Sequence, residues 1–424
     1  MLTGHSPNLS IHEKHLHDLQ AVLAVSRDLA GMMALEPILA KVEQAARAVL
    51  ECDRATVFIY DKEKDELFSR MATGVEQIRF SASRGIAGEV IRTGQIINVP
   101  DAYADPRFNP EIDKKTGYHT RNMLSFPLLG FENEPVGVLQ VLNKREGSFD
   151  PWDEELVHTF GAQVGVAVQR QTLLEQYAEK QRIQRDLNIA RSIQQSYIPA
   201  KPAEAKGFEI AGWNKPADET GGDCFDFLTL DSGDVAIMLA DATGHGIGPA
   251  LVIAPCRAMF RGAVSVLPNL GEVVGLVNNL LSDDLPGDRF VTSFFGRLCP
   301  ADSVLTFLSA GHGPLLYYTA ATNEVREMPA GGVPLGIVRD FPYGEPNRIT
   351  MQSGDMMVLI TDGFFEWVGA SGEQFGTQRI GEIVSALRDR PCSEIIQTIY
   401  DAVLKFAEGT PQADDLTAVI IKKL

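Results

Sequence analysis

Cysteine is scarce in this 424-residue sequence: there are five, and none stands in a C-x-x-C pair or at a metal-ligand spacing (Cys52, Cys224, Cys256, Cys299, Cys392). That argues against a disulfide framework and predicts reduced thiols, as in cytosolic proteins. The N-terminus lacks an apolar signal core, and no uninterrupted run of about 18 apolar residues occurs. We therefore expect a cytoplasmic protein that neither leaves the cell nor spans a membrane.

Positive charge is also in short supply, with 38 Lys and Arg against 56 Asp and Glu and a formal net charge of -18. Binding to nucleic acid or to anionic lipid needs concentrated basic side chains, so both are unexpected here. Any chemistry on phosphate would have to work through bound metal. Hydrophobic residues make up 45% of the chain, which at this length is enough for two folded cores.

The first 170 residues alternate between helical and strand-like patterns. Apolar spacing over residues 11–50 predicts helices with a break at Gly31, and short β-branched runs follow at 55–60, 95–99, 123–128 and 135–142. We expect an α+β domain over residues 1–170.

One long helix is predicted next. From Trp152 to Ile198 the chain has no proline, and apolar residues recur at three- and four-residue steps. The mixed charge of its outer positions suits a parallel coiled coil between two copies of the chain. The alternative is a helix that lies on its own domain. We take residues 171–203 as a helical connector, ended by Pro199 and Pro202.

Residues 204–424 form the predicted second domain, a layered α/β unit with two largely antiparallel sheets. Four of its aspartates stand beside glycine or another acid, and three of them adjoin a hydrophobic strand (Asp223, Asp241, Asp362, Asp414). A single Asp-Gly is often only a turn, but four such motifs favour a metal site. Oxygen donors without a His/Cys cluster select Mg²⁺ or Mn²⁺. Two such ions can activate a water for attack on phosphorus.

Six stretches of this domain, in order along the chain, resemble the metal-dependent protein phosphatase (PPM) family in its bacterial sporulation and stress-response branch. They are GGDCFDF (221–227), DATGHGIGPAL (241–251), LSAGHGPLLYY (308–318), GGVPLG (331–336), GDMMVLITDGFFE (354–366) and DDLT (414–417). The resemblance implies a β-sandwich flanked by helices and hydrolysis of phosphoserine or phosphothreonine. It also implies, as substrate, a phosphorylated anti-sigma-factor antagonist of the STAS fold.

Roles within the metal site also come from this resemblance. Asp241 would bridge both ions, with the carbonyl of Ala242 as a further ligand. Asp362 and Asp414 would complete the shell of one ion, and Asp223 would lie at the other. These four aspartates are the expected catalytic and metal-binding residues. His245 receives no proton-transfer role, because no histidine directly follows Ala242 as in eukaryotic members. Both His245 and His312 stand in Gly-His-Gly turns, where a structural, hydrogen-bonded imidazole is favoured and a catalytic one is the alternative.

Residues 20–170 resemble a GAF domain, a module that encloses a small ligand. Asn143, Lys144, Phe149 and Asp153 reproduce the NK…F…DE signature of cyclic-nucleotide-binding GAF domains. We expect an ion pair between Lys144 and Asp153 that pins the sheet to the following helix. The resemblance places ligand contacts, for cAMP or cGMP, at six positions (Ile86, Ala87, Asp113, Thr116, Thr120, Gln140). The alternative is a GAF fold that only dimerises.

Together these features predict a metal-dependent serine/threonine phosphatase regulated by a small molecule. Ligand capture would change the pitch or splay of the connector helix and so alter the metal site. Two alternatives stay open: a non-enzymatic, ligand-responsive scaffold, and a hydrolase of small phosphate esters.

Overall fold

The computed structural model describes residues 7–31, 34–69, 78–285 and 287–424. It divides into two compact units, Met1–Gln181 and Arg182–Leu424. Each unit has its own sheets and its own hydrophobic core. The expected fold class, a GAF-type α/β domain, a long helix and a β-sandwich flanked by helices, is confirmed.

A six-stranded antiparallel sheet with the order β3-β2-β1-β6-β5-β4 forms the centre of the N-terminal unit. Its strands are β1 (Cys52–Asp61), β2 (Glu66–Phe68), β3 (Arg79–Ser81), β4 (Ile97–Val99), β5 (Met123–Leu129) and β6 (Pro135–Lys144). The two longest strands, β1 and β6, pair along most of their length, and both contain apolar runs whose side chains are buried on both faces of the sheet.

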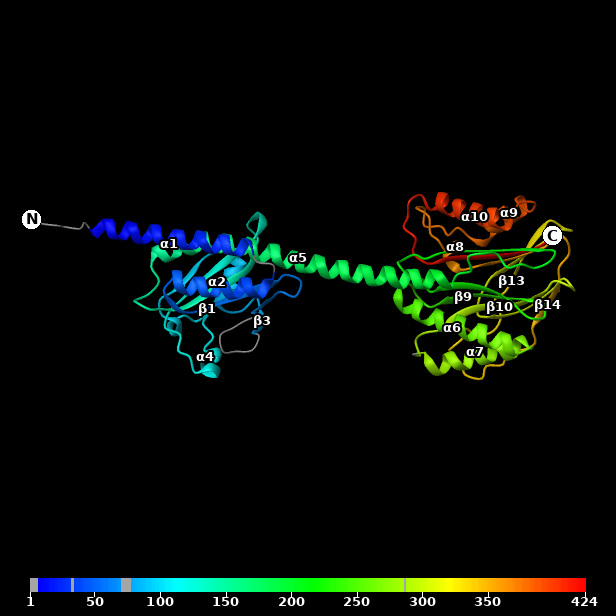
Figure 1. The fold of residues 1–424 in the computed structure, drawn as a ribbon, viewed down its shortest axis with the longest axis horizontal. Helices are drawn as coiled ribbons and strands as arrows, with labels where there is room; N and C mark the ends of the chain where they lie inside the picture. Colours follow the sequence, from blue (N-terminus) through cyan, green and yellow to red (C-terminus); the bar gives the residue numbers. More distant parts are fainter. Residues whose placement is uncertain (1–6, 32–33, 70–77, 286) are drawn as a thin grey trace, which may run out of the picture. The chain divides into compact units, whose positions relative to one another are not determined.

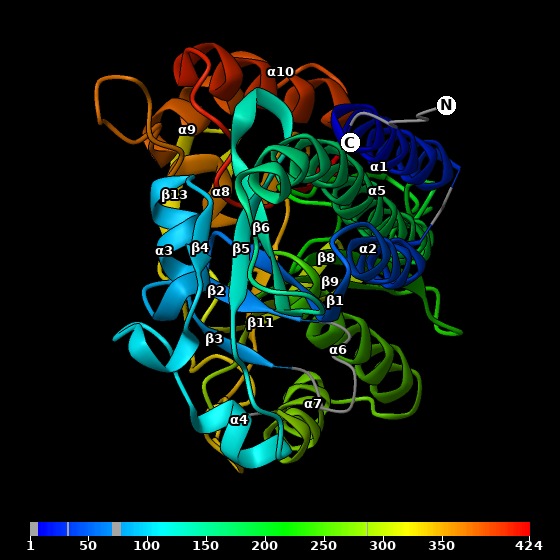
Figure 2. The ribbon, with the colours of Figure 1, turned by 90° about the vertical axis from the view of Figure 1, so that its left-hand side faces the viewer.

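Helices cover both faces of this sheet (Figure 2). On one face α1 (Pro7–Ala30), α2 (Leu35–Val49) and the start of α5 (Pro151–Tyr197) bury a continuous core. On the other face α3 (Gly85–Thr93) packs against β1 and β6. The remaining elements are the short helix α4 (Glu111–Thr116) and two 3₁₀ turns (Ala102–Ala104, Phe131–Asn133).

The predicted long helix is present as α5, which runs unbroken for 47 residues. It ends just before Pro199, whose ring cannot continue a helix. Its buried side chains stop at Gln171, and beyond that point a series of large apolar residues is exposed (Leu173, Leu174, Tyr177, Ile183, Ile189, Ile193). The second half of α5 therefore presents apolar side chains that one copy of the chain leaves uncovered.

Two five-stranded antiparallel sheets form the C-terminal unit, with the orders β14-β11-β10-β9-β8 and β13-β12-β15-β16-β7. The first contains β8 (Asp223–Thr229), β9 (Val235–Ala242), β10 (Val291–Cys299), β11 (Val304–Ala310) and β14 (Asn347–Thr350). The second contains β7 (Phe208–Lys215), β12 (Leu315–Thr319), β13 (Glu324–Met328), β15 (Met356–Ile360) and β16 (Leu416–Lys423). A core of apolar side chains from both sheets lies between them.

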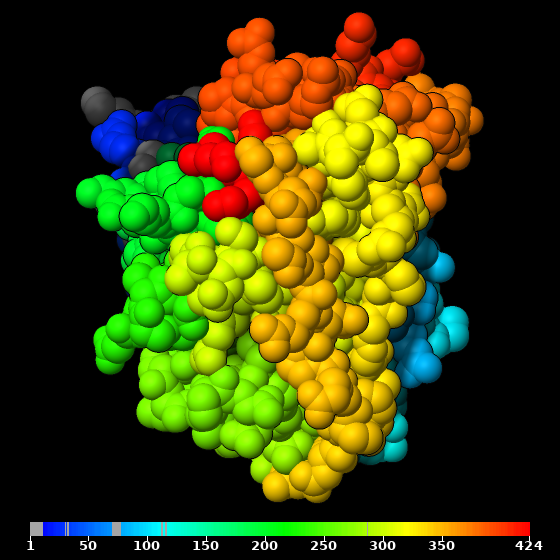
Figure 3. Space-filling model, turned by 90° about the vertical axis from the view of Figure 1, so that its right-hand side faces the viewer, coloured from blue at the N-terminus to red at the C-terminus, as the bar shows by residue number. Residues whose placement is uncertain are grey.

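Helices flank this sandwich on both outer faces (Figure 1). α6 (Ile247–Val266) and α7 (Leu270–Asp284) cover the first sheet, and α9 (Thr377–Ala386) and α10 (Cys392–Ala407) cover the second. The one-turn helix α8 (Asp362–Phe365) follows β15. The chain between β12 and β15, yellow to orange, forms much of the face seen in Figure 3.

Among the described residues, α6 alone is long and apolar enough to qualify as a membrane span by length and composition. Its inner side packs into the core below the first sheet, where Cys256 and Phe260 are fully buried. A core helix passes the same test, so this observation is weak evidence for a membrane.

Candidate metal centre and ligand pocket

The four predicted metal-site aspartates come from two neighbouring strand pairs. Asp223 begins β8 and lies directly opposite Asp241 near the end of β9. Asp362 follows β15 as the first residue of α8, and Asp414 precedes β16, the strand that pairs with β15. Because these strand ends meet where the two sheets adjoin, each carboxylate is placed by a strand rather than by a long loop.

Hydrogen bonds tie the buried acids to the surrounding backbone. The Thr361 hydroxyl donates to Asp223 Oδ2 at 2.8 Å. Asp415 accepts hydrogen bonds from the amides of Ala217 at 2.7 Å and Gly222 at 2.5 Å. Asp415 is 2% exposed, and these bonds give it a structural role inside the cluster.

Mutual repulsion and burial raise the pKa values of these acids. Burial is the largest influence on Asp241, whose pKa rises to about 7, with Asp362 and Asp414 adding to the effect. Burial and then Asp414 raise the pKa of Asp362 to about 6. The pKa of Asp223 is raised well above its usual value by burial and then by Asp241 and Asp415. No basic side chain is among the main influences on these three acids.

This donor set fits divalent cations of the Mg²⁺ or Mn²⁺ type. The side chains offer only oxygen, and a bound cation would supply the charge that the protein does not. Ala242 is buried next to Asp241, and a Cβ at Gly222 would lie 2.6 Å from its carbonyl oxygen, so the glycine leaves that oxygen room. Within the described residues, no three acid, histidine or cysteine side chains are already gathered around one point.

The two histidines of the Gly-His-Gly turns have different surroundings. His245 is exposed, and its Nδ1 lies 2.6 Å from Asp218 Oδ2, an ion pair that raises the pKa of the imidazole. His312 is 4% exposed, and burial lowers its pKa to about 4. His312 is therefore a neutral ring inside the fold.

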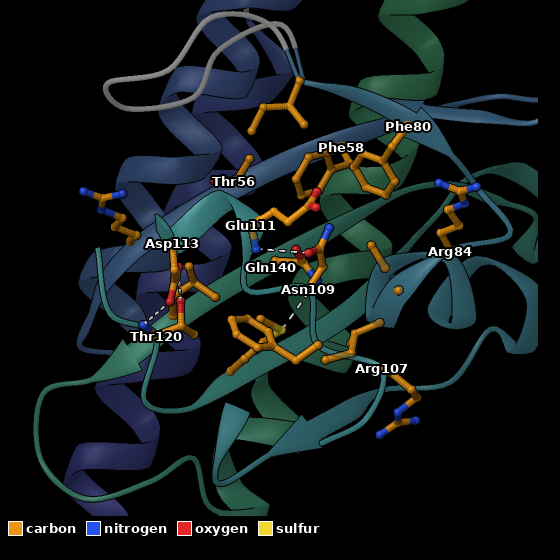
Figure 4. A pocket seen from close by; sticks show the side chains of 18 of the residues that line it. Thr56, Phe58, Phe80, Arg84, Arg107, Asn109, Glu111, Asp113, Thr120 and Gln140 are labelled. Atoms are coloured by element: carbon orange, nitrogen blue, oxygen red, sulfur yellow. Dashed lines mark hydrogen bonds between the residues drawn. The ribbon is translucent and has the colours of Figure 1, made fainter. Parts of the chain in front are cut away.

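A cavity of about 410 Å³ opens on the α3 side of the N-terminal sheet. Phe58 and Phe80 line it as a T-shaped pair with ring centroids 5.3 Å apart. Asp113 and Thr120 lie towards one end, and Arg84 and Arg107 towards the other (Figure 4). Such an arrangement offers flat apolar surface for a ring and, at Arg84, positive charge for an anion, whereas Arg107 is already paired with Asp105 and Glu89.

Three of the six residues predicted to contact the ligand lie at the ends of helices. Ile86 and Ala87 line the cavity in the first turn of α3, where helix amides lack partners within the helix and suit a phosphate. Thr116 lies at the end of α4, but its side chain is outside the described residues.

The other three predicted contact residues, Asp113, Thr120 and Gln140, make hydrogen bonds within the protein. The Asp113 carboxylate accepts hydrogen bonds from the Thr120 amide at 2.7 Å and the Thr120 hydroxyl at 2.9 Å. The Tyr103 hydroxyl adds a third at 3.2 Å. Gln140 Nε2 donates to Ser125 Oγ at 2.9 Å. All three predicted residues line the cavity, and Asp113 also fastens α4 to the segment that leads into β5.

The NK…F…DE signature stabilises the sheet below the cavity. Lys144 Nζ contacts both Asp153 carboxylate oxygens, at 2.6 and 2.8 Å, so the expected ion pair is present. Asn143, at a positive φ of 58°, donates to the His119 carbonyl and accepts from the Arg121 amide. Phe149 is buried in the core. These residues hold structure and do not line the cavity.

Several residues of the two sites were not assigned to them from the sequence. Thr361 and Asp415 complete the acidic cluster, and the signal that could have found them is their adjacency to Asp362 and Asp414. Four arginines line the cavity (Arg54, Arg79, Arg84, Arg107). They lie in separate elements, so only the folded structure shows them together.

Two family models match the chain. Residues 231–423 match Stage II sporulation protein E (SpoIIE), and residues 34–168 match the GAF domain. Asp241, Asp362 and Asp414 lie within the first match, and Asp223 lies just before it.

Individual proteins are similar to one half or the other. The chain is 28% identical over 253 residues to the phosphoserine phosphatase RsbU of Bacillus subtilis (strain 168), covering 58% of this chain and 72% of that one. It is 31% identical over 169 residues to a probable 3′,5′-cyclic phosphodiesterase of Caenorhabditis elegans, covering 36% of this chain but only 23% of the phosphodiesterase.

A solved structure supports the fold of the C-terminal unit. The SiaA-PP2C domain of Pseudomonas aeruginosa aligns with a TM-score of 0.50 and 21% identity, covering 58% of this chain and 98% of that domain. The chain thus combines an N-terminal GAF domain with a C-terminal serine/threonine phosphatase domain of the SpoIIE, PP2C-like family.

Proposed function

We propose that the chain is a divalent-metal-dependent protein phosphatase that responds to a small phosphate-bearing ligand in its GAF cavity. One observation carries the catalytic half: four aspartates with raised pKa values lie at strand ends without a basic partner among their main influences (Asp223, Asp241, Asp362, Asp415). A non-enzymatic scaffold would have no use for buried carboxylates that repel one another.

Asp223, Asp241, Asp362 and Asp414, with the Ala242 carbonyl, are the groups that would hold the metal. Bound Mn²⁺ or Mg²⁺ would lower the pKa of a coordinated water and neutralise phosphoryl oxygens. The chain's own contribution is to hold these oxygens in a rigid frame. Asp415 and Thr361 do so by bonding to the Gly222 amide and to the Asp223 carboxylate.

The substrate we propose is a phosphoserine or phosphothreonine on an anti-sigma-factor antagonist of the STAS fold. Its support is the similarity to RsbU, whose name describes a phosphoserine phosphatase. A hydrolase of small phosphate esters would use the same metal chemistry, so the substrate must be settled by comparing the two kinds of ester.

A cyclic nucleotide is our proposed GAF ligand. The aromatic pair suits a purine, the start of α3 suits a phosphate, and the similar phosphodiesterases are named for cyclic nucleotides. Asp113 would act mainly by ordering the wall of the cavity, because its oxygens already accept three hydrogen bonds from the protein.

We propose that α5 transmits the signal and joins two copies of the chain in parallel. The exposed apolar residues between Leu173 and Ile193 support this, since they follow helical spacing and would be covered in a coiled coil. We also propose that the protein works in the cytoplasm, since its five cysteines form no disulfide and four of them are buried.

The decisive experiment measures phosphate release from a phosphoserine peptide, a phosphorylated STAS protein and p-nitrophenyl phosphate. Each is tested with Mn²⁺ or with chelator, and with or without cAMP or cGMP. Metal-dependent turnover that prefers the protein ester and changes with one nucleotide supports the whole proposal. Turnover of the small ester alone favours the small-ester hydrolase, and no turnover of any ester favours the scaffold.

A further inference from the structure

The last turns of α5 belong to the C-terminal unit and contact the segment that leads into the acidic cluster, residues 217–222. Gln184 Nε2 donates to Glu219 Oε1 at 3.0 Å. Three turns later, the Gln194 side chain bonds to Gly221. The ring of Tyr197, the last residue of the helix, lies 5.4 Å from the guanidinium carbon of Arg257 on α6.

Gln194 binds both polar groups of a single residue. Its Nε2 donates to the Gly221 carbonyl at 2.5 Å, and its Oε1 accepts from the Gly221 amide at 3.0 Å. A primary amide has one acceptor oxygen and one donor nitrogen, so this pairing fixes the orientation of the Gly221 backbone as well as its position. Gly221 is buried, which removes water as an alternative partner.

The backbone that Gln194 holds continues directly into the metal-binding groups. The amide of Gly222 donates to Asp415 Oδ2, and its carbonyl accepts from the Ala242 amide at 3.1 Å. Asp223 is the next residue. A Cβ at Gly221 would lie 2.6 Å from Asp415 Oδ2, so the segment is packed tightly against that carboxylate and a shift of it would move its neighbours.

We infer that Gln194 is a positioning residue through which the end of α5 sets the geometry of the Asp223, Ala242 and Asp415 groups. The inference rests on the proposed function insofar as Asp223 and the Ala242 carbonyl bind divalent metal. While Gln194 pairs with Gly221, the 217–222 segment keeps its bonds to Asp415 and Ala242. A rotation or shift of the last turns of α5 would break that pairing and leave two buried backbone groups without partners.

The test compares three variants of the full-length chain: Gln194→Ala, Gln194→Glu and, as a control, Gln195→Ala. Gln195 is an exposed neighbour of the same type on the same helix. Each protein is stripped of metal with chelator. Mn²⁺ binding is then measured by titration calorimetry, hydrogen exchange of the peptide covering residues 217–223 by mass spectrometry, and unfolding of the C-terminal unit by calorimetry.

We expect Gln194→Ala to weaken Mn²⁺ binding about tenfold, as is usual when a residue that orients metal ligands is lost. Exchange at Gly221 and Gly222 should accelerate, while the melting temperature stays within a few degrees. Gln194→Glu keeps the acceptor but loses the donor, so its Mn²⁺ affinity should fall between alanine and wild type. Gln195→Ala should match wild type in both measurements.

Unchanged Mn²⁺ affinity and exchange in Gln194→Ala would overturn the inference. So would a general loss of stability across the C-terminal unit, because that would make Gln194 an ordinary packing residue. A wild-type chain that binds no Mn²⁺ would refute the metal proposal instead. In that case, exchange at Gly221 and Gly222 still decides whether Gln194 holds the segment.

Discussion

Asp113 in the N-terminal unit and Asp223 in the C-terminal unit are both buried carboxylates, 6% and 4% exposed, but their surroundings differ. Asp113 accepts three hydrogen bonds from neutral donors. Asp223 accepts hydrogen bonds from Thr361 and Thr417, but burial and then two other carboxylates, Asp241 and Asp415, still raise its pKa. The first carboxylate is compensated by neutral donors, whereas the second is left with a repulsion that a bound cation would relieve.

The GAF signature and the phosphatase motifs differ in the same way, by whether the protein compensates their acids. In the GAF signature, Lys144 neutralises Asp153 within the fold, so the motif holds the sheet together. In the phosphatase motifs, one acid follows or faces another, so the arrangement is unfavourable while the acids are ionised, and a bound cation would relieve it. A buried acid indicates a ligand site only when the protein itself leaves it uncompensated.

The largest expected effect comes from Asp241, the acid that faces Asp223. Asp241→Asn should lower metal-dependent phosphate release by more than about a hundredfold, the upper end of the loss seen when only an outer partner of a metal ligand is removed. In chelator, the variant should unfold no earlier than wild type, because one repelling carboxylate is gone. Phosphate release and melting temperature with and without Mn²⁺ measure the two effects. The control is Asp231→Asn, at an exposed residue of a turn. A fully active Asp241→Asn would show that the buried acids of the C-terminal unit are not needed for catalysis.

Removing one partner of the Lys144–Asp153 ion pair should lower the stability of the N-terminal unit, whereas removing one acid of the C-terminal cluster should not. Lys144→Met leaves Asp153 buried without its cation and should destabilise the unit by about 3 kcal/mol. The control is Lys62→Met, which removes an exposed pair with Glu134 and should change stability by less than about 1 kcal/mol. Denaturant unfolding of the full chain, followed by hydrogen exchange in β6, measures both. Equal effects of the two variants would show that burial of this pair is unimportant.

An intermediate effect is expected at Asp113. Asp113→Asn turns an acceptor of three hydrogen bonds into a group with one acceptor oxygen and should cost about 2 kcal/mol. Exchange of the Thr120 amide should accelerate, while phosphate release in the absence of nucleotide stays at the wild-type level. Asp53→Asn, at an exposed acid of β1, should have almost no effect on stability. If Asp113→Asn keeps full stability but abolishes nucleotide binding, the residue is a ligand contact and its structural role is secondary.

Much of the architecture could be predicted because its signals are local. The helix predicted from Trp152 to Ile198 runs from Pro151 to Tyr197, since proline and periodicity are properties of neighbouring residues. Pro391 separates α9 from α10 in the same way, since a proline ring cannot continue a helix.

The sites were harder to predict because their residues meet only in three dimensions. Asp223, Asp241, Asp362 and Asp414 carried motifs of their own and could be grouped before the fold was known. Gln194 carries no motif, and its bond to Gly221 spans 27 residues. The arginines around the GAF cavity lie in different elements for the same reason. Whether an acid is compensated depends on neighbours that sequence spacing does not give.

The smallest expected effect concerns Glu43, a buried acid that the protein compensates only in part. It is 8% exposed on α2 and accepts one hydrogen bond, from the Val57 amide at 3.3 Å. Burial raises its pKa to about 7 despite that bond and Arg47, so it stands between the satisfied Asp113 and the uncompensated Asp223. The folded chain therefore binds a proton here that the unfolded chain releases near pH 4.5.

The stability that Glu43 contributes should be complete below about pH 4.5 and should be lost as the pH rises through about 7. Glu43→Gln keeps the acceptor oxygen without the charge. It should leave stability unchanged at pH 5 and raise it by about 1 kcal/mol at pH 8, a value reduced from the full shift because buried sites relax and admit water. Unfolding of wild type, Glu43→Gln and the exposed Glu51→Gln across this range measures the difference. A gain at pH 8 confined to Glu43→Gln would extend the rule to an acid with a single neutral partner, whereas equal curves would mean that one amide is enough to compensate a buried carboxylate.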